Sequence, residues 1–203
     1  MELRENVNSL KTNVKGQNNI LNIDQKSKNY QLDVNIVGSN NKIIVGEGTS
    51  VKKLQIEIKG DNNLVKIGKR CSVVGKIVIN GKSQTVSIGD KTTFGNATLL
   101  SRDGQDITIG EDCLFSTAIK IRTSDSHPII DVDTKEKINN PGHVHIGDHV
   151  WVGAEVVILK GSYIPSDSII GASSVVTKKF TEEHTVIAGF PAQVIKRGTS
   201  WER

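Results

Sequence analysis

An aliphatic residue recurs at every sixth position through one long segment of the chain, a spacing that fits neither an α-helix nor an alternating strand. The residues in this register are Ile146, Val152, Ile158, Ile164, Ile170 and Val176. Small or compact side chains come four positions after the first five of them, at Val150, Val156, Ser162, Ser168 and Ser174. Each hexad therefore predicts one short strand and one corner. Stacked with the aliphatic residues inward, such hexads form a hexapeptide-repeat parallel β-helix.

Glycine directly follows three of these aliphatic residues, as Gly147, Gly153 and Gly171. A positive φ is costly for a residue that carries a Cβ atom. We therefore expect glycine to be needed at these corners for its backbone conformation.

A longer repeat precedes the hexads. A glycine followed by polar residues, many of them Asn or Gln, recurs every 21 to 23 residues, at Gly16, Gly38, Gly60, Gly81 and Gly104. A coil of three six-residue sides needs about 18 residues, so we expect a small extra turn at each Asn-rich corner. Asn side chains stacked between coils can bond to one another. This structural interpretation is favoured over a ligand-binding Asn ladder.

Composition limits the remaining possibilities. The 203 residues include only four prolines and 4% aromatics, which suits one narrow domain filled by stacked aliphatic residues, without a linker. A net charge of +4 favours anionic ligands and is equally consistent with a generic solvated surface. No apolar run approaches the roughly 18 residues of a membrane span, and the N-terminus lacks a signal-peptide pattern. We expect a cytoplasmic protein that has no membrane span and does not bind nucleic acid.

The repeat is interrupted once, by a long polar segment that contains His127 between Asp125 and Pro128. Long loops on rigid scaffolds are usually functional or disordered, so His127 is the candidate for acid–base chemistry. The predicted organisation of the single domain 1–203 is an N-terminal lead-in (1–15), Asn/Gly-rich coils (16–122), a protruding loop (123–143), regular hexapeptide coils (144–178) and a C-terminal tail (179–203).

The two cysteines follow the same register. Cys71 and Cys113 each lie four residues after an aliphatic residue of their coil, with Thr92 in the equivalent place between them. Two coils at about 4.8 Å each separate them, which is beyond the reach of a disulfide. We expect reduced core residues rather than nucleophiles.

The run from Ile146 to Gly198, the Ser-Asp-Ser-His-Pro segment that ends at Pro128 and the Gly-x-Asn-Asn coils resemble the left-handed β-helix acetyltransferases that use acetyl-CoA. Within them, the chain is most similar to the polysaccharide O-acetyltransferases of capsule and lipopolysaccharide assembly, including those that act on polysialic acid. The resemblance implies an all-β, left-handed parallel β-helix. It also implies a homotrimer with acetyl-CoA in clefts between subunits and a glycan acceptor, without a metal.

The resemblance places the family's catalytic histidine at His127 and its tryptophan at Trp151, 24 positions later. Neutral imidazole can accept the proton of a sugar hydroxyl as that hydroxyl attacks a thioester. Asp125, two residues earlier, could orient the ring or could simply cap the loop. Trp151 should project outward with Ile169 of the next coil, as a substrate or cofactor contact or as interface packing. Something should cover this surface and a second outward pair, Val157 and Val175.

The resemblance also implies contacts to acetyl-CoA. Small side chains would let the backbone approach the pantetheine arm, and polar or cationic side chains would meet its phosphates. The corresponding residues are Ala154, Ala172, Thr177, Lys178, and Lys196 or Arg197. Gln193 departs from the family pattern, because the sugar acetyltransferases often have a basic residue there. Asn96 aligns with a position that contacts the acceptor in those enzymes.

Two other classes of function remain open. Gamma-class carbonic anhydrases share the β-helix, and His143, His145 and His149 could bind zinc. Their spacing does not match the ligand pattern of that family. The other alternative is a non-catalytic trimeric β-helix scaffold, which the loop around His127 and the Gly171–Lys178 segment argue against.

Overall fold

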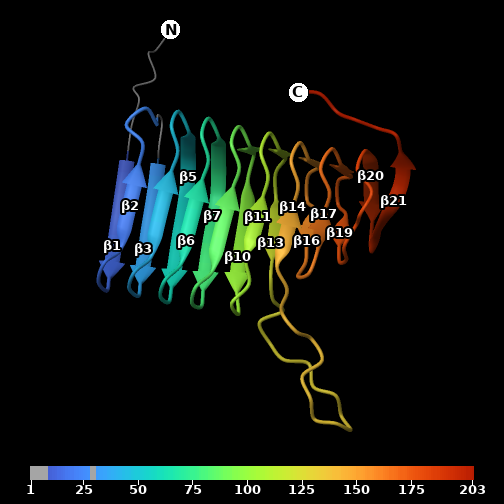
Figure 1. The fold of residues 1–203 in the computed structure, drawn as a ribbon, viewed down its shortest axis with the longest axis horizontal. Coiled ribbons are helices and arrows are strands. Elements are labelled where there is room, and N and C mark those ends of the chain that lie inside the picture. Colours follow the sequence, from blue (N-terminus) through green and yellow to red (C-terminus); the bar gives the residue numbers. More distant parts are fainter. Residues whose placement is uncertain (1–8, 28–30) are drawn as a thin grey trace.

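The structure, a computed structural model, describes residues 9–27 and 31–203. The chain forms an all-β solenoid whose coils stack along one axis (Figure 1). A regular coil has three short strands, such as β14 (Val144–Ile146), β15 (Trp151–Val152) and β16 (Val157–Ile158), joined by four-residue corners. The strands pair in parallel with those of the next coil, and the pair β20–β21 is antiparallel. The predicted parallel β-helix is confirmed.

Three sides run along the solenoid. The first side is a seven-stranded sheet of β2 (Ile20–Ile23), β4 (Lys42–Val45), β6 (Leu64–Ile67), β8 (Thr85–Ile88), β11 (Ile107–Ile109), β14 and β17 (Tyr163–Ile164). The second side contains β9 (Thr93–Phe94), β12 (Leu114–Phe115), β15, β18 (Ile169–Ile170) and β20 (Thr185–Gly189). The third side contains β1 (Ser9–Lys15), β3 (Gln31–Val37), β5 (Ser50–Lys59), β7 (Ser72–Asn80), β10 (Ala97–Arg102), β13 (Ile119–Arg122), β16 and β19 (Val175–Val176). Strand β7 also pairs with β9, which joins the second and third sides.

The core follows the hexad register. All six aliphatic markers from Ile146 to Val176 are 0% exposed. They stack coil on coil, as Ile109, Ile146 and Ile164 do in consecutive strands of the first side. The compact residues of the fourth position, including Val150 and Ser168, are buried as well. The prism is therefore filled by stacked aliphatic side chains, as the sequence predicts.

The glycines are placed as predicted, but the predicted cause is wrong. Positive φ is adopted two positions later by residues that carry a Cβ atom, with φ of 52° at His149 and 61° at Glu155. Gly147 and Gly153 are not among the residues with positive φ. A Cβ atom on Gly153 would lie 2.7 Å from the backbone nitrogen of Ala172 in the next coil. Close approach between coils therefore explains these glycines.

The Asn-rich corners are held by a ladder of amides. The backbone N and Nδ2 of Asn63 donate to Oδ1 of Asn41 at 3.0 and 2.9 Å, and both residues are 0% exposed. Gly60 has φ of 130°, and a Cβ atom there would lie 1.8 Å from the oxygen of Gly81. The favoured structural role of the ladder agrees with this burial. The expected extra turn is absent: the corner 60–63 has four residues, and the flanking strands are longer instead.

The two ends of the solenoid differ from the predicted boundaries. Strand β1 begins at Ser9 and pairs with β3, so part of the expected lead-in 1–15 already belongs to the solenoid; residues 1–8 lie outside the described residues. In the expected tail, β20 and β21 (Ala192–Arg197) form a closing hairpin, and the last residues run back along the solenoid (Figure 1). Within 9–27 and 31–203, no helix is long and apolar enough to cross a membrane.

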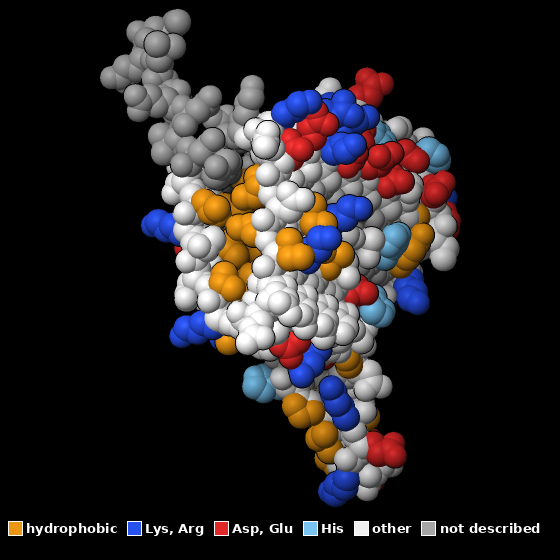
Figure 2. Space-filling view, turned by 60° about the vertical axis from the view of Figure 1, so that its left-hand side comes forward, with side chains coloured by type: hydrophobic (Ala, Val, Ile, Leu, Met, Phe, Trp, Pro, Cys, Tyr) orange, Lys and Arg blue, Asp and Glu red, His pale blue; other side chains and the backbone are white. Residues whose placement is uncertain are grey.

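The segment between β13 and β14 protrudes from the solenoid as a narrow hairpin (Figure 1). The backbone nitrogen of Ile138 donates to the oxygen of Ile129 at 2.9 Å, next to an antiparallel bridge between Ile130 and Lys137. Figure 2 shows apolar side chains along this projection. Four of them are 45% to 77% exposed: Ile129, Ile130, Val132 and Ile138. The predicted loop is therefore a hairpin with exposed apolar side chains among charged ones.

Candidate active site

A polar network around Asp125 fixes the neck of the loop, the part near the solenoid where Asp125 and His127 lie opposite Asn139. Nζ of Lys160 lies 2.5 Å from Oδ2 of Asp125, and Nδ2 of Asn139 donates to the same oxygen at 2.8 Å. Asn139 also donates to the backbone oxygen of His127 at 2.9 Å. The hydrogen bond from Lys160 lowers the pKa of Asp125 below its usual range; partial burial opposes this effect, and the bond from Asn139 adds to it. The carboxylate therefore stays charged and holds the two strands of the neck together.

The predicted role of Asp125 in orienting His127 is not what the structure shows. The Asp125 carboxylate bonds to Lys160 and Asn139, and no group among the described residues hydrogen-bonds to the His127 ring. The His127 side chain is exposed, so both ring nitrogens are open to a ligand. Asp125 acts on the backbone, through Asn139, which is the loop-capping alternative.

Trp151 projects outward from β15, as predicted, and is 40% exposed. It is in register with Leu114 on one neighbouring strand and with Ile169 on the other. The second outward pair, Val157 with Val175, is in register on the third side. Two adjacent sides of the solenoid therefore present apolar side chains.

The C-terminal residues cover the solenoid beside Trp151, a contact that the sequence did not reveal. Trp201 is 6% exposed and lies with its ring centroid 6.4 Å from that of Trp151. Arg203 extends the contact, with Nε 3.1 Å from Oδ1 of Asp112. Partial burial alone would raise the pKa of Asp112, but hydrogen bonds from His149 and Arg203 and the Arg203 charge hold it below its usual range. Only the outward register of Trp151 hinted that something would pack there.

His127 and Trp151 occupy different sides of one chain. Trp151 lies on the second side, whereas the loop that carries His127 leaves the third side after Arg122 and returns to the first side at Val144. The corner 153–156 and the third side separate the two. The structure therefore does not bring the predicted catalytic pair together within a single chain.

The corner between the second and third sides has free backbone donors. At the corner between the first and second sides, the matching amide is bonded: Lys69 N donates to Oδ1 of Asp90 at 2.8 Å, and Asp148 N to Oγ of Ser166 at 3.1 Å. Ala154 and Ala172 hold the matching position at the corner between the second and third sides, and an alanine has no side-chain oxygen to accept such a bond. Among the described residues, neither of their amides donates a hydrogen bond. These N–H groups can therefore bind a ligand.

Asn96 belongs to the same line of corners as Ala154. It is exposed, and the backbone bonds from Asn96 N to Ser116 O and from Ile119 N to Asn96 O place it two coils towards the N-terminus. The position is compatible with a ligand that extends along this corner.

A groove near the C-terminal end gathers part of the predicted phosphate site. Lys178, Gln193 and Arg197 line it, and Nζ of Lys178 donates to Oε1 of Gln193 at 2.6 Å. Arg197 is paired with Glu182 at 2.6 Å. Two further predicted residues, Thr177 and Lys196, are exposed and do not line the groove. The structure therefore unites Lys178 with Arg197 rather than with Lys196.

The cysteines are unsuited to nucleophilic catalysis. Both are buried and free, and the backbone nitrogen of Cys113 donates to Oγ1 of Thr92, the residue between them. Burial raises the pKa of Cys113 to about 12 and also raises that of Cys71. Each thiol stays protonated, as expected for core residues.

The three histidines considered for a zinc site each contact a different partner. His143 Nδ1 accepts from the backbone of Asp106 at 2.9 Å, the His145 ring stacks on Tyr163, and the His149 ring stacks on Trp201. The alternative therefore has no support from their arrangement.

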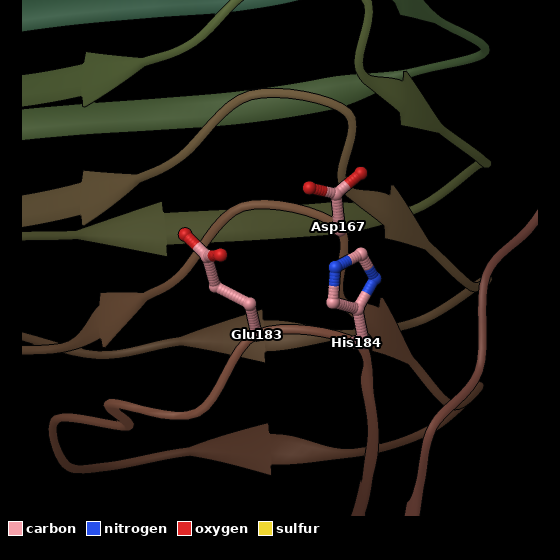
Figure 3. Close-up of side chains that lie close together, drawn as sticks. All are labelled: Asp167, Glu183 and His184. Carbon is pink, nitrogen blue, oxygen red and sulfur yellow. The ribbon is translucent and has the colours of Figure 1, made fainter.

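One other group could hold an ion by geometry. Within the described part of the chain, ligand atoms of Asp167, Glu183 and His184 lie within 4.8 Å of one another, and Figure 3 shows the three side chains close together. Glu183 and His184 are exposed, and no buried atom lacking a partner lies among them. Two surface carboxylates beside an imidazole need no ion to explain them.

Comparison with known proteins gives the class. A family model described as bacterial transferase hexapeptide (six repeats) matches residues 143–178. The crystal structure of the polySia specific acetyltransferase NeuO is 35% identical, with a TM-score of 0.88, over 96% of this chain and 89% of that one. The polysialic acid O-acetyltransferase OatWY is 30% identical, with a TM-score of 0.72, over 95% and 91%.

A curated relative is the polysialic acid O-acetyltransferase of Escherichia coli O1:K1 / APEC, 37% identical over 83 residues. That alignment covers 41% of this chain and 27% of the relative. The long structural matches show that the chain belongs to the hexapeptide-repeat acetyltransferases. Within that family it is similar to the polysialic acid O-acetyltransferases.

Proposed function

We propose that this chain is an O-acetyltransferase that moves acetyl from acetyl-CoA to a hydroxyl of an acidic cell-surface polysaccharide or its precursor. The observation that carries the proposal is the similarity to the polySia specific acetyltransferase along 96% of the chain, at a TM-score of 0.88. Because acetyl-CoA is a cytoplasmic metabolite, we place the reaction in the cytoplasm.

His127 is the proposed general base. Its ring is exposed, and both ring nitrogens lack a partner among the described residues, so one can accept a proton from an acceptor hydroxyl. Hydrogen bonds run from Lys160 to Asp125, from Asn139 to Asp125, and from Asn139 to the backbone oxygen of His127. They fix the backbone that carries the His127 ring. The proton that His127 accepts is returned to the leaving thiol. The active ring is neutral at the start of each cycle.

The residues of one corner and one groove fit acetyl-CoA. The free amides of Ala154 and Ala172 can bond an extended arm along the corner, and Lys178 and Arg197 can meet phosphates at the C-terminal groove. Acetyl-CoA supplies an acyl group activated for attack by the hydroxyl. Arg197 would exchange its Glu182 partner for a phosphate.

We further propose that the active enzyme is a homotrimer with each site shared between two subunits. His127 and Trp151 lie on different sides of one chain, so a site that contains both requires a second copy. The apolar side chains of the protruding hairpin, 45% to 77% exposed, and the outward Trp151 give two surfaces that a neighbouring subunit can cover. The hairpin of one subunit would close the cleft that carries Trp151 of the next.

The test is acetyl transfer by the purified chain. Thiol release from acetyl-CoA is followed against a panel of sialic acid polymers, uronic acid polymers and neutral glycans, with product acetylation read by mass spectrometry. We expect release that depends on an acidic glycan. No release with any glycan would favour the non-catalytic scaffold.

A further inference from the structure

Two arginines at the end of the third side converge on one hydroxyl. Arg102 is the last residue of β10, and Arg122 is the last residue of β13. Nη1 of Arg102 and Nη2 of Arg122 each lie 3.3 Å from Oγ of Ser126. Ser126 directly precedes His127 in the chain. The arginine pair therefore stands at the foot of the loop that carries the proposed base.

Neither guanidinium forms a salt bridge among the described residues, although the Arg122 charge contributes to the lowered pKa of Asp125. The acidic side chains of this corner are engaged elsewhere: Asp103 accepts from Oγ of Ser124, and Asp125 accepts from Lys160 and Asn139. Nε of Arg102 is buried and has no hydrogen-bond partner within residues 9–27 and 31–203. Both arginine side chains are half-buried, so each is accessible to a ligand.

Holding the loop does not require both arginines. Nε of Arg122 already donates to the backbone oxygen of Ser124 at 2.8 Å. A second guanidinium beside the same neutral oxygen adds repulsion between like charges, and partial burial weakens the screening of that repulsion. An anion that joins the pair removes the repulsion, because the planar guanidinium donates paired hydrogen bonds to a carboxylate or phosphate.

We propose that Arg102, Arg122 and Ser126 bind a carboxylate of the glycan acceptor, beside the hydroxyl whose proton His127 accepts. The inference rests on the proposed function and deepens it, because it restricts the acceptor to glycans that carry a carboxylate near the acetylated hydroxyl. A cofactor phosphate is the other available anion. The groove of Lys178 and Arg197, however, lies at the C-terminal end, beyond β19, whereas the arginine pair lies on β10 and β13.

The test compares two acceptors that differ only in charge. Oligosialic acid and its carboxyl methyl ester are acetylated by the wild-type protein and by Arg102→Gln, and kcat/KM is measured for each. We expect the wild type to prefer the acid by about 10- to 100-fold, the usual effect of a charged hydrogen bond. Arg102→Gln should lose that factor on the acid and almost nothing on the ester. Arg70→Gln is the matched control: it removes an exposed arginine more than a coil away and should change neither.

The other outcomes overturn the inference. Equal losses on both acceptors would mean that Arg102 only holds the loop. A raised KM for acetyl-CoA, with an unchanged KM for the acceptor, would assign the arginines to a cofactor phosphate.

A wild-type protein that acetylates neither acceptor removes the proposed function, and calorimetric binding of oligosialic acid then decides the inference separately. Binding that weakens by about 10- to 100-fold in Arg102→Gln keeps the carboxylate site. Failure of the wild type to bind the acid form overturns it.

Discussion

The indole of Trp201 stacks on the imidazole of His149, with ring centroids 4.4 Å apart and an angle of 11° between the rings. Nε1 of Trp201 donates to the backbone oxygen of His149 at 2.8 Å. The chain thus folds its C-terminus back onto a corner 52 residues earlier. This contact also lies beside Trp151, so it couples the C-terminus to the proposed site.

Trp201→Ala should release the C-terminal residues and lower the free energy of unfolding by about 3 kcal/mol, the lower end for loss of a buried tryptophan. Trp201→Phe keeps a ring on His149 and loses one hydrogen bond, at a cost of about 1 kcal/mol. Chemical denaturation measures both. Equal stability of Trp201→Ala and the wild type would show that the stack contributes nothing.

The Asp125–Lys160 contact should make the loop neck sensitive to acid. Because the pKa of Asp125 is lowered in the folded chain, its contribution to stability is complete above the unfolded carboxyl pKa of about 3.9 and is lost as pH falls through the lower folded value. Hydrogen exchange at the Ile129 amide, which donates to Asn139, reports the neck. We expect its protection to fall below about pH 4 in the wild type, whereas Asp125→Asn should be less protected throughout and lack this step. A wild-type profile without the step would contradict the assignment.

Lys178→Ala should raise the KM for acetyl-CoA more than it lowers kcat, because contacts remote from the reacting carbonyl stabilise ground and transition states alike. Lys66→Ala, which removes an exposed lysine on the first side, is the control and should change neither constant. Steady-state kinetics with acetyl-CoA varied at saturating glycan measures the split. A change confined to the KM for glycan would place Lys178 in the acceptor site instead.

Mixing two inactive subunits tests the shared site. His127→Ala lacks the base, and Ala172→Trp blocks the corner that carries the free amides. If each site takes these positions from different chains, dissociation and reassembly of the two variants together should restore part of the activity. Mass spectrometry verifies that mixed trimers form. Mixed trimers without activity, or a fully active wild-type monomer, would contradict the shared site.

The solenoid was predictable because its six-residue period can be recognised in one continuous stretch of sequence. The aliphatic register from Ile146 to Val176 determines which side chains stack, and each buried marker follows from it. The cause of the Gly153 requirement was not predictable, since the distance to Ala172 is set by a residue one coil away. Local sequence shows periodicity, whereas approach between coils appears only in the folded chain.

The candidate site was predictable in its residues and less so in its contacts. The interrupted repeat pointed to His127, and the outward register pointed to Trp151. The partner of Asp125 was missed because Lys160 lies 35 residues later, on a neighbouring corner. Trp201 was missed for the same reason: an irregular terminal segment has no period from which its position can be inferred.

Acetyl transfer by His127→Ala tests the central claim most directly. The loop lies outside the stacked core, so circular dichroism should match the wild type, while loss of the general base should reduce kcat/KM by about 10² to 10⁴. His184→Ala, an exposed histidine outside the loop, is the matched control and should keep its activity. We predict near-complete loss of acetyl transfer to the acidic glycan in His127→Ala and no loss in His184→Ala. Transfer by that variant at the wild-type rate would contradict the account.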